Sequence, residues 1–109
     1  MIARLWSARL ESPRIQDYAD HLNTHVLPDL KKVAGYAGAQ LLVRDQSDQS
    51  EIIVITFWQS LESIRAFAGD DLEKAVVTDE AAALMSCFDE RVKHYRLLIQ
   101  DGFNQASKV

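Results

Sequence analysis

Residues 52–71 read IIVITFWQSLESIRAFAGDD, and this stretch decides the fold. Its first seven residues are apolar except for Thr56, which is typical of a strand covered on both faces. The polar pair Gln59 and Ser60 then breaks the run, and apolar residues recur at helical spacing until Gly69. The stretch therefore predicts a central strand that leads directly into a helix.

The composition is that of one folded domain. Of the 109 residues, 48% are hydrophobic, which is enough apolar surface for a core. We expect a single domain over residues 1–99 and a polar tail over residues 100–109. Acidic residues number 16 against 12 basic ones, the formal net charge is -4, and the basic residues are scattered. This pattern argues against a nucleic-acid partner.

Cysteine content and apolar runs bear on the compartment. Cys87 is the single cysteine and cannot form a disulfide within the chain. A strand-like pattern begins at Ile2 with no signal-peptide pattern ahead of it. No apolar run approaches the roughly 18 residues that a membrane span needs. We therefore expect a cytoplasmic protein with no membrane partner.

The segments before the central strand predict a strand, a helix and a further strand. Residues 2–10 alternate with period two. Residues 13–33 carry a helical apolar stripe, with Ser12 as the expected N-cap and a kink expected at Pro28. Residues 36–44 resume a strand pattern and are expected to pair with the central strand through a hairpin.

The segments after the helix that ends at Gly69 complete the pattern. We expect a helical turn over residues 71–76, a helix over residues 78–87 and a fourth strand over residues 88–99. The resulting order, βαββαβ, predicts an α+β, ferredoxin-like fold in which one antiparallel four-stranded sheet carries the helices on one face.

The other face of such a sheet needs a cover, because an apolar open face is unstable in water. We assign Ile2, Arg4 and Trp6 to this open face, where Glu90 or Glu51 would neutralise Arg4. A homodimer with two sheets packed face to face is the simplest cover.

Three segments carry a family resemblance. FWQSLESIRAF at residues 57–67, LKKVAGYAG at residues 30–38 and VKHY at residues 92–95 resemble the antibiotic biosynthesis monooxygenase family of dimeric α/β barrels. The resemblance implies a homodimeric barrel with a pocket between the sheet and the helices of each subunit. It also implies oxidation of flat aromatic substrates by dioxygen with no metal or flavin cofactor. Other branches of the family degrade haem, process small signalling molecules or have no known activity.

The haem-degrading branch is recognised by three residues that differ in this chain. The resemblance places its strand Asn at Ser7, its helix Trp at Phe67 and its iron-ligating His at Val77. Because valine cannot ligate iron, the sequence argues against haem degradation.

Polar residues beside the apolar stripe of the long helix are candidates for chemistry. His25 is the better candidate for a base in the pocket, with Tyr18 and Asp29 on the same flank. His21 and His25 stand one turn apart and could share a metal, but a site needs a third ligand, and exposed helix histidines are the simpler interpretation. We therefore predict no metal site.

Two neighbouring residues of the last strand must point to opposite faces of the sheet. We expect Tyr95 to face the helix-side pocket and His94 to face the dimer interface. The predicted catalytic residues are then His25 and Tyr95, and the predicted substrate-binding residues are Tyr18, Ser7, Phe57 and Phe67.

Two classes of function follow. One is a cofactor-independent monooxygenase that acts on a small aromatic or polyketide-like substrate. The other is a non-catalytic dimeric protein that binds a small ligand. Motifs for serine hydrolysis, phosphate loops and CxxC redox chemistry do not occur in the sequence.

Overall fold

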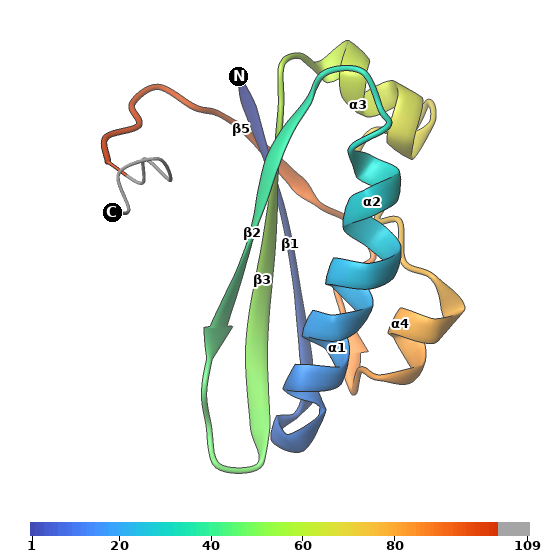
Figure 1. The fold of residues 1–109 in the computed structure, drawn as a ribbon, viewed down its shortest axis with the longest axis vertical. Helices are drawn as coiled ribbons and strands as arrows, with labels where there is room; N and C mark the ends of the chain where they lie inside the picture. The colour runs from blue at the N-terminus through green and yellow to red at the C-terminus, as the bar shows by residue number, and fades with distance from the viewer. Residues whose placement is uncertain (103–109) are drawn as a thin grey trace.

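The computed structural model describes residues 1–102 of the chain as one antiparallel sheet with helices on one face (Figure 1). The strands are β1 (Ile2–Glu11), β2 (Tyr36–Arg44), β3 (Gln49–Trp58), β4 (Cys87–Phe88) and β5 (Lys93–Arg96). The helical segments are a 3-10 turn at Ser12–Arg14, α1 (Ile15–His21), a π-helical turn at Leu22–Val26, α2 (Leu27–Leu30), α3 (Leu61–Ala68) and α4 (Asp79–Ala83). The predicted α+β, ferredoxin-like fold is confirmed. From residue 103 on, the predicted polar tail lies outside the described residues.

The strand order is β2-β3-β1-β4, and β5 also pairs with β1. The predicted fourth strand over residues 88–99 is therefore interrupted. Between β4 and β5 the chain leaves β1 and pairs with the segment after α3, where Ala75 donates to the carbonyl of Glu90 and Val92 donates to the carbonyl of Glu73. These backbone hydrogen bonds replace the ones that a continuous strand would make with β1.

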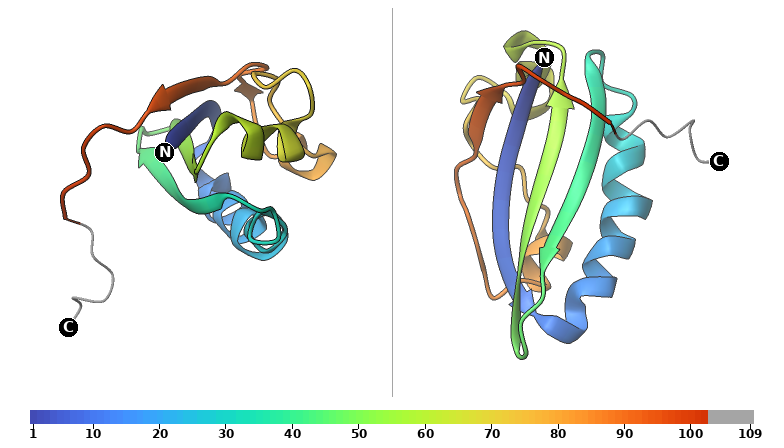
Figure 2. Two further views of the ribbon diagram at one scale, coloured as in Figure 1. Left: turned by 90° about the horizontal axis from the view of Figure 1, so that it is seen from above. Right: turned by 90° about the vertical axis from the view of Figure 1, so that its left-hand side faces the viewer.

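One nearly continuous helix, from α1 through the π turn to α2, runs along one face of the sheet, roughly in the direction of the strands (Figure 1 and Figure 2). A kink was expected at Pro28, and the structure instead has a π turn at Leu22–Val26, after which the helix continues through Pro28 in α2. Proline has no N–H to donate, and its ring collides with the carbonyl four residues earlier, so the helix widens there.

Ser12 was the expected N-cap of the long helix, but its hydroxyl instead donates to the Gln46 carbonyl at 2.7 Å.

Two expected helical segments after α3 are shorter than the sequence predicted. The predicted helical turn over residues 71–76 is a turn with an isolated bridge from Lys74 to Arg91. The predicted helix over residues 78–87 is confined to α4, capped by Thr78, whose hydroxyl accepts from the Ala81 amide. The residues after α4 pair with β1 instead, since Ser86 donates its amide to the carbonyl of Arg9. No helix within residues 1–102 is long and apolar enough to cross a bilayer.

The core lies between the sheet and the helices. Alternate residues of β3 are buried, and Trp58 and Ile52 are fully so. The Trp58 ring stacks on Phe67 of α3 with centroids 5.5 Å apart, and its Nε1 donates to Thr56 Oγ1 at 2.8 Å. Trp58 therefore fixes α3 against the end of β3.

The β1 residues on the open face of the sheet are not the ones that the sequence predicted. Ile2, Arg4 and Trp6 point toward the helices, since Ile2 packs with the Trp58 cluster and Trp6 lies 6.4 Å from Tyr18, centroid to centroid. Register then places Leu5 of β1 opposite Ile55 of β3 on the uncovered side, which the right panel of Figure 2 faces. The prediction of an apolar open face holds, but with the opposite set of β1 residues.

The start of α3 fits closely against the turn before β2. Gly35 has a φ of 91°, its carbonyl accepts from the Gln59 amide at 2.9 Å, and an added Cβ would collide with Ser63. Ser60 caps α3 by accepting from the Ser63 amide. No side chain other than hydrogen fits at Gly35 without moving this cap.

We expect Gly35→Ala to lower the free energy of unfolding by about 2 to 3 kcal/mol, because it combines positive-φ strain with a steric collision. Gly69→Ala is the matched control, since Gly69 also has a positive φ of 86° but nothing lies within 4 Å of its added Cβ. Urea unfolding of both variants measures the difference. Equal losses would show that the contact with Ser63 is unimportant.

Candidate functional site

A cavity of about 330 Å³ lies between the helix-facing side of the sheet and the helices. Its walls come from β1, β3, the long helix, α3 and the segment that precedes α4, and they are mostly apolar. The lining residues are Arg4, Trp6, Tyr18, Leu22, His25, Val26, Asp29, Leu30, Val33, Val54, Thr56, Ala66, Phe67, Val76, Val77, Thr78, Ala81 and Val92. An apolar cavity with a few polar groups is typical of a small-molecule site.

Tyr18 supplies a buried polar group. The residue is 5% exposed and packs in the core beneath the long helix. Its hydroxyl makes no hydrogen bond within residues 1–102 and is not fully buried, and the residue lines the cavity. Burial raises the pKa of Tyr18 to about 12. At neutral pH the phenol therefore stays protonated and can donate to a ligand.

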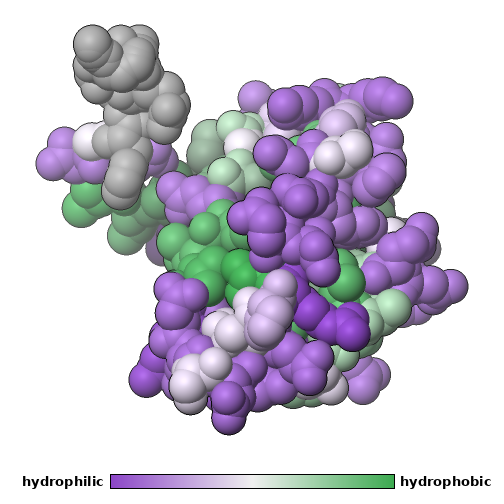
Figure 3. All heavy atoms as spheres, turned by 60° about the horizontal axis from the view of Figure 1, so that its bottom comes forward, coloured by the Kyte–Doolittle hydropathy of each residue, from purple (hydrophilic) through white to green (hydrophobic). Residues whose placement is uncertain are grey.

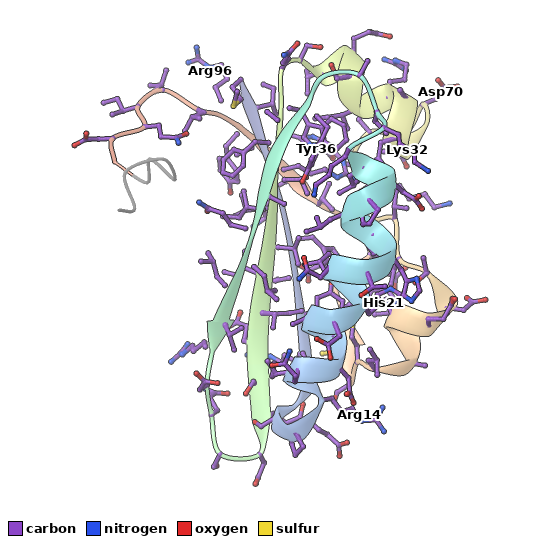
Figure 4. All side chains as sticks on the ribbon, viewed as in Figure 1. Arg14, His21, Lys32, Tyr36, Asp70 and Arg96 are labelled. Carbon is purple, nitrogen blue, oxygen red and sulfur yellow. The ribbon has the colours of Figure 1, made fainter. Side chains whose placement is uncertain are left out.

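His25 lies at the rim of the same cavity and is exposed. Its ring centroid is 5.5 Å from that of His21, which does not line the cavity. His21 instead faces the segment before α4, with Nε2 3.4 Å from Thr78 Oγ1 (Figure 4). Within residues 1–102 no third ligand joins the two histidines. Of the two histidines, only His25 borders the cavity.

Arg4 is a cavity residue that the sequence analysis misplaced. It is 4% exposed and donates through Nη1 to the Leu72 carbonyl at 2.6 Å and through Nη2 to the Lys74 carbonyl at 2.8 Å. His94 Nε2 lies 2.9 Å from Nη1 and must accept, because arginine has no acceptor. The expected partners Glu90 and Glu51 make no contact with it within 4 Å.

His94 is thus a helix-side residue, opposite Arg4 in the register of β5 with β1. Burial, followed by the nearby charge of Arg4, lowers the pKa of His94. A neutral imidazole is the form that can accept from Arg4. Strand alternation alone could not show which of His94 and Tyr95 faces the helices, because that depends on the register with β1.

Of the predicted site residues, three line the cavity. Tyr18, His25 and Phe67 do so, and Phe67 contributes a ring stacked on Trp58. These placements support the pocket that the family resemblance implied.

The other three predicted site residues lie elsewhere. Tyr95 is 50% exposed on the uncovered face, where it pairs with Ala3, so the expected orientation toward the pocket is wrong. Phe57 shares that face, since β3 alternates and its neighbours Thr56 and Trp58 are buried. Ser7 points the same way and donates to Asp89 Oδ2 at 2.8 Å. None of the three lines the cavity.

No family model matches the sequence, and no curated protein matches it. Solved structures do match. A protein from Bacillus cereus described as an antibiotic biosynthesis monooxygenase is 12% identical with a TM-score of 0.66, covering 94% of this chain and 97% of its own. The haem degrader MhuD from Mycobacterium tuberculosis, with two haems bound in its active site, is 15% identical with a TM-score of 0.59, covering 94% and 100%.

A third structure is a monooxygenase from the ActVA-Orf6 gene of Streptomyces coelicolor in complex with nanaomycin D. It is 13% identical with a TM-score of 0.58 and covers 93% of this chain and 92% of its own. These matches span nearly the whole length of both compared chains, so the likeness concerns the complete domain. The chain therefore has the ferredoxin-like fold of antibiotic biosynthesis monooxygenase-type proteins.

Proposed function

We propose that the protein belongs to the antibiotic biosynthesis monooxygenase family and oxidises a small aromatic or polyketide-like substrate with dioxygen and no cofactor. The observation that carries the proposal is the apolar cavity lined by the buried Tyr18, whose hydroxyl has no hydrogen-bond partner within residues 1–102, with His25 at its rim. The same fold in a monooxygenase that holds nanaomycin D agrees with it.

The reaction needs three contributions from the chain. His25 removes an acidic proton from an activated C–H group of the substrate, and the carbanion transfers electrons to dioxygen. A peroxide forms at that carbon and loses water, so that a CH₂ group and O₂ become a C=O group and H₂O with no external reductant. Tyr18 donates to the substrate oxygen on which negative charge develops, and the apolar walls exclude water.

Haem degradation is not proposed. Val77 and Phe67 line the cavity, at the positions that the resemblance assigns to the iron ligand and the helix Trp of that branch. Neither side chain can ligate iron, and Ser7 is turned to the other face of the sheet.

A non-catalytic ligand-binding protein is the second candidate. It is favoured by one observation: the predicted catalytic pair His25 and Tyr95 is not assembled, since the two residues lie on opposite sides of the sheet.

We also propose that two copies form a homodimer through the uncovered face of the sheet. This face carries half-buried Ile53, Ile55 and Phe57 and exposed Leu42 and Tyr95. Figure 3 views the molecule obliquely from its lower end and shows some hydrophobic surface toward the left, the side on which the uncovered face lies in Figure 1. A contiguous apolar face of this kind is typical of an interface.

Oxygen uptake distinguishes the two functions. We expect a screen of hydroxylated aromatic compounds under air to show uptake, and His25→Ala to reduce it by about 100-fold because the base is lost. Tyr18→Phe should reduce it about tenfold, because one hydrogen bond to the developing charge is lost.

The matched controls are His21→Ala, which removes an imidazole one turn away, and Tyr95→Phe, which removes a hydroxyl from the other face. Both should keep the wild-type rate. Uptake that His25→Ala leaves unchanged would remove the assigned base, and no uptake with any compound would favour the ligand-binding protein.

Analytical ultracentrifugation tests the dimer. We expect a mass of twice the 12.3 kDa chain at micromolar concentration. Leu42→Glu should give single chains, because it places a charge in the interface. Leu61→Glu is the matched control, because Leu61 is 46% exposed on α3 and Leu42 is 47% exposed on the open face. A wild-type mass of one chain would contradict the proposal.

A further inference from the structure

Arg4 is a buried cation without a buried counter-charge. It is 4% exposed, and within residues 1–102 no carboxylate lies within 4 Å of its guanidinium. Burial lowers the pKa of Arg4 to about 10, so the group is still charged at neutral pH. A buried charge is costly unless an opposite charge or several hydrogen bonds compensate it.

The hydrogen bonds of Arg4 leave part of the guanidinium free. Arginine has five N–H donors, and three of them are used by the carbonyls of Leu72 and Lys74 and by His94. The remaining donors are the Nε–H and one Nη2–H. Nε has no hydrogen-bond partner in the described part of the chain. Every fully buried side-chain nitrogen there has a partner, so Nε is not fully buried. Since Arg4 lines the cavity, these donors are available to a bound molecule.

The charged residues of the cavity are distributed unevenly. Asp29 is exposed at the rim, with its Oδ1 3.8 Å from Lys32 Nζ, and His25 is exposed beside it. Arg4 is the buried member of the set. The ring of Phe67 lies 5.6 Å from Arg4 Cζ and partly balances its charge. The inner end of the cavity is therefore positive and is bordered by an aromatic face.

We infer that the cavity takes an aromatic acid, with its ring against the apolar walls and its ionised oxygens accepting hydrogen bonds from the free donors of Arg4. The inference rests on the proposed function for the presence of an aromatic molecule in the cavity, and it names the class of that molecule. Two donors on different nitrogens of a planar group match the two oxygens of a carboxylate. A neutral ligand of the same shape would bring no opposite charge to Arg4.

The test compares two ligands that differ in charge but not in shape, 2-naphthoate and 2-naphthamide. Isothermal titration calorimetry with the wild-type protein should give a dissociation constant at least about tenfold lower for the acid, because charge-assisted hydrogen bonds are roughly twice as strong as neutral ones. This comparison needs no variant, so it does not depend on how well an Arg4 variant folds.

Variants locate the effect. Arg4→Gln should abolish the preference for the acid, and Arg4→Lys should retain part of it, because lysine keeps the charge but loses the planar fork. Arg14→Gln is the control, since Arg14 is exposed and does not line the cavity. Circular dichroism of each variant checks its fold.

The outcomes separate this inference from the proposed function. Equal binding of acid and amide by the wild type would overturn the aromatic-acid assignment and leave an aromatic site in place. A preference for the acid that survives Arg4→Gln would overturn the role of Arg4. Binding of neither compound at millimolar concentration would overturn both. Preferential binding of the acid by a protein that never consumes oxygen would keep the inference and reject the monooxygenase.

Discussion

The packing of Trp58 is the constraint on which the rest of the structure depends. Its side chain is fully buried at the end of β3, with Tyr36 of β2 edge-on at 5.5 Å and Phe67 of α3 stacked at 5.5 Å. A large aromatic ring held on two sides contributes more to stability than its buried area alone. Through these contacts one residue sets the position of α3 and brings Phe67 to the cavity wall, next to Arg4.

The fold could be predicted because the patterns that define it are local. The strand, the polar break at Gln59 and Ser60 and the helix within residues 52–71 each follow from a few neighbouring residues. The interruption of the last strand could not be predicted in this way. It depends on backbone hydrogen bonds between residues 90–92 and residues 73–75, which no sequence period reveals.

The site could be predicted only where residues share the long helix. Tyr18 and His25 stand at helical spacing and reach the same cavity. Tyr95, Ser7 and Phe57 were misplaced because a strand has two equivalent faces, and a one-residue difference in register exchanges them. Arg4 was missed for the same reason. The sequence showed that Arg4 and Trp6 lie on the same face of β1. The structure shows which face this is, because Trp6 contacts Tyr18 of the long helix.

The bonds from Arg4 to the carbonyls of Leu72 and Lys74 tie the segment after α3 to β1, an inner strand of the sheet. That segment continues into Val76 and Val77, which form part of the cavity wall. One guanidinium thus holds the wall with some of its donors and offers the others to the cavity. A ligand that bound Arg4 would therefore also stabilise this segment, and its occupancy would be thermodynamically linked to the local stability of the cavity wall.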